Sequence, residues 1–387
     1  MPTKDELKQL QSLPLDMKIW RTKQRIREWV NHYGENGVYV SFSGGKDSTV
    51  LLHIVREMYP DIEAVFVNTG LEFPEIQKFA QSFPNVKVLY PNVPFYEVMA
   101  QYGYPLISKT VSHNVGVLRR NPDGRVAHNI FAPEKRGPFA MFKWKPLSGM
   151  DFCLSEKCCD FTKKEPAHKY SRESGKMSIT AQMACESKLR EKEWLESGCN
   201  AFGNDNPVSN PMSFWTEQDI LLYIKIHKEE MVQERIKNIE ERYGCPLEEI
   251  INPKTGEPTY SREKMTPICE VYGDVVYDCD EPEQERFAEA TALKLKTTGC
   301  HRTGCIYCPF GAHLEKKGET RFQRLARTHP KQYAFCINGG AHDPSDGLWK
   351  PTKEGLGLGY VFDCINKIYG ENFIRYKPDD QEDKNVK

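Results

Sequence analysis

The sequence predicts an α/β fold: a doubly wound parallel sheet with an inserted loop region and a C-terminal, cysteine-rich helical extension. Short apolar runs alternate with helix-like segments through the first half of the chain. This is the pattern of a parallel sheet that helices cover on both faces. A glycine-centred turn joins the first apolar run directly to a helix. Because ligands of such sheets bind beyond the carboxyl ends of the strands, that turn marks the expected site.

The expected elements begin with a helix. Residues 16–33 place apolar side chains at helical spacing, and the pattern stops at Gly34. A strand starting at Val38 follows, and Pro74 opens the helix after the second strand. The remaining strands are expected at residues 64–67, 86–89 and 177–180, and a helix through Arg190 and Trp194 follows the last of them.

Composition narrows the class of protein. The formal charge of −1 gives the whole chain no general attraction to nucleic acid or membranes. No apolar run approaches the roughly 20 residues of a membrane span, and the N-terminus has no apolar signal region. We therefore expect a cytoplasmic protein with no membrane partner. Its thirteen cysteines favour metal ligation or thiol chemistry over a disulfide framework.

The turn after the first strand reads Ser43-Gly44-Gly45-Lys46-Asp47-Ser48. The two glycines let the backbone approach an anion, and the following helix points its first N–H groups at that anion. Lys46 adds a positive charge, the two serines add hydroxyl donors, and Asp47 can hold a metal ion or cap the helix. The Walker spacing is absent. Instead the turn matches the pyrophosphate loop of enzymes that split ATP between its α and β phosphates, so we expect nucleotide binding here.

Two further segments are expected on the same rim of the sheet. Asn68, Thr69 and Gly70 follow the second strand, and another segment follows Thr180 at the end of the fourth. Parallel strands bring their carboxyl ends to one edge, so these residues should lie near the loop.

Residues 103–150 read as an irregular insertion with scattered Gly and Pro. Between Lys109 and Lys145 it carries eight Lys or Arg against two acids. Aromatic side chains are interleaved with these charges, at Phe131, Phe139, Phe142 and Trp144. Such a mixture suits single-stranded nucleic acid or a flipped base. The alternative is a solvated loop that a few aromatic residues anchor.

Two cysteine clusters indicate a metal centre. The first contains Cys158 and Cys159 with Cys153 upstream, and the second contains Cys300, Cys305 and Cys308 with Cys336 downstream. The second has an iron–sulfur spacing, although a C-x-x-C pair also suits zinc or a redox dithiol. We expect a [4Fe–4S] cluster, with zinc as the alternative. The other cysteines have no partner spacing and are expected to be structural: Cys185, Cys199, Cys245, Cys269, Cys279 and Cys364.

From about residue 36 to 312 the chain resembles the phosphoadenosine phosphosulfate (PAPS) reductase family of the adenine nucleotide α-hydrolase-like, or PP-loop ATP pyrophosphatase, superfamily. That resemblance implies a Rossmann-like sheet. Five stretches carry it, in the family's order: Ser43–Ser48, Asn68-Thr69-Gly70 with Phe73-Pro74-Glu75, Cys158-Cys159-x3-Lys163-x2-Pro166, Pro211 with Trp215-Thr216 and Asp219-Ile220, and Gly304-Cys305-x2-Cys308. It also implies nucleotide contacts at Glu186 and Arg190.

Positions at which this chain departs from the family pattern distinguish ATP use from reduction of a sulfonucleotide. Reductase loops usually lack a lysine, so Lys46 indicates ATP use. Reductases also need a nucleophilic Cys in a C-terminal tail, whereas Cys364 is the last Cys here and has an apolar context. Met183 stands where the family has an Arg, and losing an Arg removes a bidentate anion clamp.

The expected domain bounds follow from these motifs: 1–35 for an N-terminal helical segment, 36–227 for the PP-loop domain with its insertion at 103–150, 228–295 for a charged helical insertion, 296–377 for the cysteine-rich metal-binding region and 378–387 for a disordered tail.

The expected activity is ATP-dependent, iron–sulfur sulfur transfer (thiolation) by adenylylation of an acceptor, with ATP and Mg²⁺. Lys46, Asp47 and Cys159 are the expected catalytic residues.

Cys158, Cys305 and Cys308 are expected to bind the cluster, and Cys159 and Cys300 compete for the fourth position. A free one would carry sulfur from a donor such as a cysteine desulfurase, and a nucleic acid is a possible acceptor. The alternatives are a PAPS or adenylylsulfate reductase, in which Cys159 is the fourth ligand, and a nucleotide-binding regulatory subunit without catalysis.

Overall fold

The computed structural model describes residues 2–132, 134, 140–203, 207–279 and 294–378. The predicted disordered tail therefore lies almost wholly outside the described residues, as do Lys135 and Phe139 of the insertion. The chain forms two compact units. Unit 1 comprises residues 1–68, 72–90 and 167–303, and unit 2 comprises 69–71, 91–166 and 304–387.

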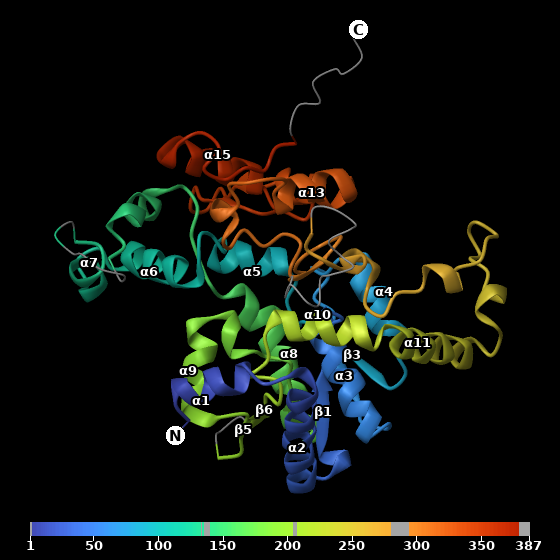
Figure 1. Ribbon diagram of the computed structural model, residues 1–387. Coiled ribbons are helices and arrows are strands. Elements are labelled where there is room, and N and C mark those ends of the chain that lie inside the picture. The colour runs from blue at the N-terminus through green and yellow to red at the C-terminus, as the bar shows by residue number, and fades with distance from the viewer. Residues whose placement is uncertain (1, 133, 135–139, 204–206, 280–293, 379–387) are drawn as a thin grey trace. The chain divides into compact units, whose positions relative to one another are not determined.

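Unit 1 contains the central sheet, whose strand order is β3-β2-β1-β4-β6-β5 (Figure 1). Neighbouring strands from β3 to β6 pair in parallel, and β5 is antiparallel to β6. The strands are β1 (Val38–Ser41), β2 (Ala64–Val67), β3 (Val86–Leu89), β4 (Met177–Ile179), β5 (Asn200–Ala201) and β6 (Val208–Ser209). The predicted doubly wound parallel sheet is thus confirmed, as are four of its strands.

The helices of unit 1 begin with α1 and α2, and α2 ends at Gly34 as predicted. They are α1 (Lys4–Gln11), α2 (Leu15–Tyr33), α3 (Lys46–Met58), α4 (Pro74–Ser82), α8 (Glu165–Ser174, mostly in unit 1), α9 (Lys188–Ser197), α10 (Glu217–Ile226) and α11 (Lys228–Tyr243). Short helical turns are η1 (Glu35–Gly37), η4 (Ala184–Glu186), η5 (Leu247–Glu249), η6 (Arg262–Lys264) and η7 (Glu270–Tyr272). A small antiparallel pair joins β7 (Val275–Tyr277) to β8 (Leu295–Thr297).

The core of unit 1 explains why β1 reads as a continuous apolar run. Val38, Tyr39 and Val40 are all buried, although successive side chains of a strand point to opposite faces. Tyr39 packs against Tyr170 of α8, with ring centroids 5.3 Å apart. The two valines therefore face the opposite layer, and helices cover both faces of the sheet.

Unit 2 is largely helical, and this includes the insertion that the sequence analysis took to be irregular. Its elements are α5 (Phe95–Tyr102), α6 (Lys109–Arg120), α7 (Arg125–Asn129), η2 (Phe142–Gly149), the π-helical turn η3 (Asp160–Lys164), η8 (Ala312–Leu314), α13 (Arg321–Thr328), α14 (Pro330–Ile337), β9 (Ala341–His342), β10 (Trp349–Lys350) and α15 (Leu358–Tyr369). Val111, Val115 and Leu118 are buried on one face of α6. The expectation of an irregular loop was wrong because this helical spacing was overlooked.

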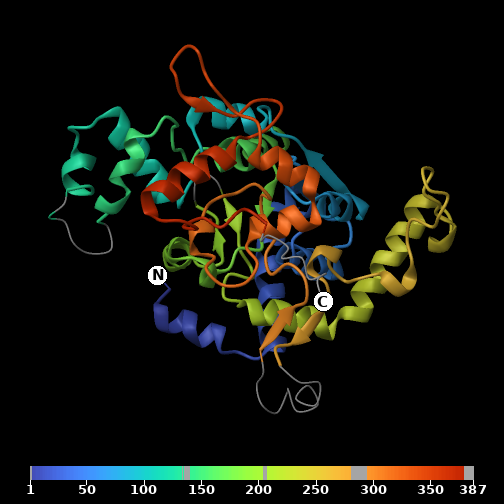
Figure 2. The same cartoon turned by 90° about the horizontal axis from the view of Figure 1, so that it is seen from above.

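The C-terminal helices of unit 2 confirm the predicted helical extension. In Figures 1 and 2 the orange α13 and the red α15 lie side by side. Phe322 of α13 and Phe362 of α15 form their contact, with ring centroids 5.0 Å apart, and both rings are fully buried. Across the described ranges, no helix combines the length and the apolar character that a membrane span needs.

Candidate functional site

The Ser43–Ser48 loop connects β1 to α3 as predicted, at the point where the order of the sheet reverses. The strands on either side of β1 are β2 and β4, so the loop and the segment after β4 leave neighbouring strands at the same edge. This is the topological switch point at which doubly wound sheets bind ligands. Asn68 follows β2 in unit 1, and its N–H donates to the Leu89 carbonyl. Thr69 and Gly70 belong to unit 2.

Glycine at position 44 is required by the backbone. Its φ of +70° lies in the left-handed region, and a Cβ at this position would stand 3.0 Å from Cγ2 of Ile76. Gly45 is the N-cap of α3 and has no side chain to accept the first helical N–H groups. The serine hydroxyls of Ser43 and Ser48 lie 3.0 Å apart and brace the loop. Three N–H groups of the loop donate to hydroxyls: Ser43 to Ser48, Gly45 to Ser43 and Lys46 to Tyr272. An anion at this helix N-terminus competes with these hydroxyl acceptors.

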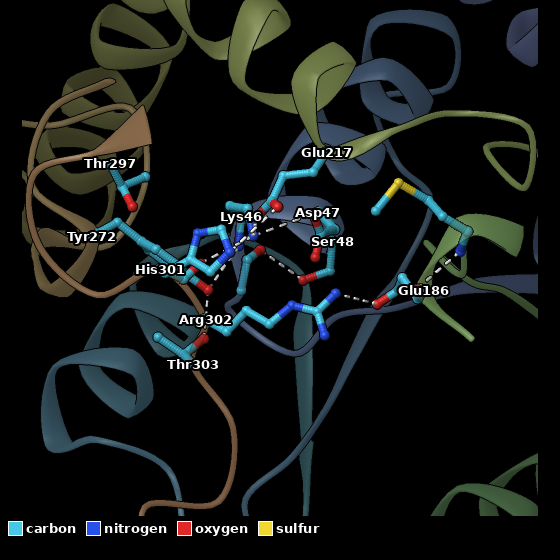
Figure 3. A network of polar contacts seen from close by, with 12 residues as sticks. Lys46, Asp47, Ser48, Glu186, Glu217, Tyr272, Thr297, His301, Arg302 and Thr303 are labelled. Atoms are coloured by element: carbon cyan, nitrogen blue, oxygen red, sulfur yellow. Dashed lines mark hydrogen bonds and ion pairs between the residues drawn. The ribbon is translucent and has the colours of Figure 1, made fainter. Parts of the chain in front are cut away.

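Lys46 is buried, with 3% of its surface exposed, and it contacts residues from distant parts of unit 1 (Figure 3). Its Nζ lies 3.0 Å from Oε1 of Glu217 and donates to the His301 carbonyl at 3.3 Å. Its backbone N–H donates to the hydroxyl of Tyr272 at 3.2 Å, and that hydroxyl also bonds Oγ1 of Thr303. A charged ammonium is rarely buried without compensation. Here a carboxylate and a carbonyl provide it.

Two carboxylates beside Lys46 are the candidate oxygen ligands for the predicted Mg²⁺ ion. Oδ1 of Asp47 and Oε1 of Glu217 are buried and accept no hydrogen bond. They lie 3.9 Å and 3.0 Å from Nζ of Lys46. Burial raises the pKa of Asp47, and the Lys46 charge opposes that rise. Hard carboxylate oxygens with an open position suit Mg²⁺, which is usually held by one or two carboxylates together with substrate phosphates.

Glu186 and Arg190 lie where the sequence expected them, on the segment after β4. Oε2 of Glu186 accepts the Met183 N–H at 3.1 Å, and its carboxylate pairs with Arg190. A second guanidinium, that of Arg302, lies 3.6 Å from Oε1. Met183 itself is buried in the core. Cys185, which was expected to be structural, is exposed on this turn, and its thiol donates to the Trp215 carbonyl at 3.4 Å.

Four of the five predicted cluster ligands belong to unit 2: Cys158, Cys159, Cys305 and Cys308. Cys300 belongs to unit 1. The Cys158 and Cys159 thiols lie 3.9 Å apart. The turn η3 follows directly, and Oγ1 of Thr162 donates to the Cys158 carbonyl. Single π-helical turns are frequent at functional sites.

A second segment of unit 2 holds the other pair. The Cys308 N–H donates to the Cys305 carbonyl at 3.0 Å, which closes a tight turn. Nη1 of Arg321 donates to the carbonyls of Cys308 and Phe310, both at 3.0 Å, and fixes the end of that turn. Arg321 is oriented in turn by Glu315.

The thiols of the two segments influence one another electrostatically. The hydrogen bond with Cys159, burial and the charges of Cys308 and Cys305 raise the pKa of Cys158. The hydrogen bond from Cys158, aided by Lys109 and Lys163, lowers the pKa of Cys159 to about 6. A [4Fe–4S] cluster takes four cysteine thiolates, and these four cysteines belong to one unit. Within the described residues no group of three or more His, Cys, Asp or Glu that could hold a metal ion is present.

Several residues around the loop were missed by the sequence analysis: Glu217, Tyr272, His301, Arg302 and Thr303. Glu217 had a local signal, because it follows Thr216, which caps α10. The other residues had none.

The sheet order, the loop and its helix N-terminus define an α/β protein with a doubly wound sheet and a loop at its topological switch point. Residues 37–98 match the phosphoadenosine phosphosulfate reductase domain. The chain is 30% identical over 106 residues to a PAPS reductase from Xanthomonas oryzae, covering 26% of this chain and 44% of the relative. The chain thus spans less than half the length of that relative.

Two solved structures are also similar. The PAPS reductase from Candida auris aligns with 59% of this chain and 88% of its own, at 14% identity and a TM-score of 0.32. The U34-tRNA thiolase from Methanococcus maripaludis, solved with its [4Fe–4S] cluster, aligns with 59% of this chain and 75% of its own, at 16% identity and a TM-score of 0.29.

Proposed function

We propose that this protein is an ATP-dependent iron–sulfur enzyme that transfers sulfur to an acceptor oxygen site after adenylylation. The observation that carries the proposal is Lys46, an ammonium buried at the N-terminus of α3 in a Ser-Gly-Gly-Lys-Asp-Ser loop. A nucleotide with a pyrophosphate leaving group needs this charge, and a sulfonucleotide does not have that group.

In the first step an acceptor oxygen attacks the α phosphorus of ATP, and the bond to the bridging oxygen breaks. Pyrophosphate leaves with the electron pair of that bond. Lys46, its backbone N–H and the loop amides stabilise the charge that develops on it. When bound, Mg²⁺ would be held by Asp47 and Glu217 and would supply further charge neutralisation.

In the second step a sulfur nucleophile attacks the acceptor carbon, and AMP leaves with the electron pair of the carbon–oxygen bond. A cluster bound by Cys158, Cys305 and Cys308 would supply a site for the transferred sulfur. Cys159 is the fourth ligand or, if it stays free, the sulfur carrier. The sulfur donor is a separate protein such as a cysteine desulfurase, which delivers sulfur at the persulfide level. When a Cys159 persulfide releases that sulfur to a second thiol's attack, an external thiol reduces the disulfide that remains.

The test combines metal analysis with nucleotide binding. Protein purified without oxygen should be brown and contain iron and sulfide. Calorimetry should show ATP binding that Lys46→Ala weakens by about ten- to a hundred-fold, since a charge-assisted contact contributes roughly 1.5–3 kcal/mol. Lys192→Ala is the matched control, because Lys192 is an exposed lysine on α9. Tight binding of phosphoadenylyl sulfate without ATP binding would contradict the proposal.

Sulfonucleotide reduction is the second candidate. The sequence match to PAPS reductases favours it, as does the presence of Cys158, Cys159, Cys305 and Cys308 in unit 2. Reductase activity with phosphoadenylyl sulfate or adenylylsulfate, and no pyrophosphate release from ATP, would select this candidate.

The proposed acceptor is a nucleic acid bound by unit 2. Lys109, Arg120, Arg125, Lys143 and Lys145 are exposed. Of the aromatic residues in this region, Phe142 is 46% exposed, whereas Phe131 and Trp144 are buried core residues. Phe142 is therefore the aromatic side chain of the described insertion that is available for stacking on a base.

Binding of labelled DNA and tRNA across a salt series tests the acceptor. The variant should replace Arg120, Arg125, Lys143 and Lys145 with Ala. Arg119 stays, because it donates to the Met150 and Phe152 carbonyls and supports the fold. Each lost phosphate contact should reduce the salt slope by roughly 0.7–0.9. A control variant removes four exposed cations from unit 1: Lys8, Arg27, Lys192 and Lys237. If both variants show the same dependence of binding on salt concentration, this surface of unit 2 does not bind the nucleic acid.

A further inference from the structure

Two arginines share a single carboxylate at the rim of the nucleotide loop. Glu186 pairs with Arg190 through Oε2, and Nη2 of Arg302 lies 3.6 Å from its Oε1. Oε2 also accepts the Met183 N–H. One carboxylate therefore faces two guanidinium groups beside the loop. Guanidinium groups bind phosphate oxygens through charge-assisted, often bidentate, hydrogen bonds.

The backbone on either side of Arg302 is fixed to the loop. The preceding carbonyl, of His301, accepts a hydrogen bond from Nζ of Lys46, and the following side chain, of Thr303, bonds Tyr272. Tyr272 in turn accepts the Lys46 N–H. Figure 3 shows the Arg302 side chain extending from this segment past the loop toward Glu186. The guanidinium is thereby held at the rim that parallel sheets use for ligands.

Exposure and charge indicate that Arg302 meets a ligand rather than stabilising the fold. Its side chain is 59% exposed, and an exposed ion pair contributes only about 0–1 kcal/mol. Burial and the neighbouring charge of Arg302 lower the pKa of Arg190, so the two guanidinium groups repel each other in the absence of an anion. The Asp47 carboxyl lies within the influence of both arginines and of Lys46. Lys46, Arg190 and Arg302 thus all act on the Asp47 carboxyl, together with the negative charge of Glu217.

We propose that Arg302 and Arg190 form a two-arginine clamp for the pyrophosphate part of the bound nucleotide, together with Lys46. This assignment rests on the proposed function. The resemblance leads us to expect an arginine at position 183, where this chain has Met183. Arg302 would supply a guanidinium in place of that arginine. Arg302 supplies a guanidinium to the same segment from a place more than a hundred residues further along the chain.

Calorimetry with Mg²⁺-pyrophosphate, ATP and adenosine tests the clamp. Arg302→Ala should weaken binding of pyrophosphate and of ATP by about ten- to a hundred-fold. Arg302→Lys should lose less, because it keeps the charge but not the fork of donors. Binding of adenosine should not change, since it has no phosphate. Arg27→Ala is the matched control, because this arginine is exposed on α2 and donates to the Gln24 side chain.

Unchanged pyrophosphate and ATP affinities in Arg302→Ala would overturn the clamp. So would a fall in the unfolding temperature of the ligand-free variant that accounts for the whole loss, because that result would make Arg302 structural. If the wild type binds phosphoadenylyl sulfate and not ATP, the proposed function fails. The titrations of the same variants with Mg²⁺-pyrophosphate then decide the clamp separately.

Discussion

The backbone N–H of Lys46 donates a hydrogen bond to the hydroxyl of Tyr272, 226 residues further along the chain and 3.2 Å away. This N–H belongs to the first turn of α3. It is one of the donors that a helix N-terminus offers to an anion. The Tyr272 hydroxyl thus occupies a position at the loop that a phosphate oxygen can take.

Tyr272→Phe should strengthen pyrophosphate binding. Removing the hydroxyl leaves the Lys46 N–H without its acceptor in the ligand-free protein, which costs about 1 kcal/mol of stability. A phosphate oxygen then restores the bond, so affinity should rise about five-fold. Calorimetry and thermal unfolding measure the two effects. If Tyr272→Phe binds pyrophosphate more weakly than the wild type, the Tyr272 hydroxyl stabilises the complex with pyrophosphate instead.

Gly44→Ala should destabilise the protein more than Gly34→Ala. Both glycines have positive φ, +70° and +79°, so each substitution strains the backbone by roughly 1 kcal/mol. A Cβ at position 44 would also press on Ile76, whereas the space around position 34 is open. Overpacking adds about 1–3 kcal/mol. Denaturant unfolding of both variants measures the difference in their free energies of unfolding. Equal decreases would show that the Ile76 side chain moves aside at no cost.

Cys305→Ser and Cys308→Ser should each lose iron, sulfide and brown colour when purified without oxygen. Serine is a poor ligand for a cluster that thiolates hold. Cys245→Ser, in the separate small core of α11, is the control and should keep the cluster. Iron and sulfide analysis gives the readout. Stoichiometric zinc without sulfide in the wild type would identify a zinc site and exclude the sulfur-transfer mechanism.

His53 should make stability fall as the pH decreases below its ordinary pKa of 6.5. Burial is the largest influence on this imidazole and lowers its pKa, against the charges of Glu234 and Glu230. Nδ1 of His53 contacts the Tyr223 hydroxyl at 2.7 Å. Below pH 6.5 the unfolded chain binds a proton that the folded one does not, so stability decreases, by at most about 1.4 kcal/mol per pH unit.

His53→Gln removes this titration while retaining a polar side chain. The free energies of unfolding of wild type and variant, measured between pH 7.5 and about 5, should converge as the pH falls. A constant difference across that range would show that His53 does not titrate between the two states.

Patterns among neighbouring residues were sufficient to predict the part of the sheet that surrounds the loop. The apolar run from Val38, the glycines and the helix after them lie within a few residues of one another, so their pattern alone predicts strand, turn and helix. The insertion was misread because its Gly and Pro residues outweighed a short helical pattern at Val111, Val115 and Leu118. Its aromatic residues also could not be sorted into exposed and buried ones, because that depends on the tertiary packing of unit 2.

The sequence by itself determined the α/β fold, the loop from Ser43 to Ser48 and the cysteine motifs, because each depends on residues that are close along the chain. Only the tertiary structure decided what surrounds Lys46. Glu217, Tyr272 and Arg302 reach the loop from separate elements, and folding alone brings them together. The grouping of Cys158 and Cys159 with Cys305 and Cys308 in one unit has the same cause. Contacts between distant segments follow from how the helices and strands pack, and no local pattern in the sequence records them.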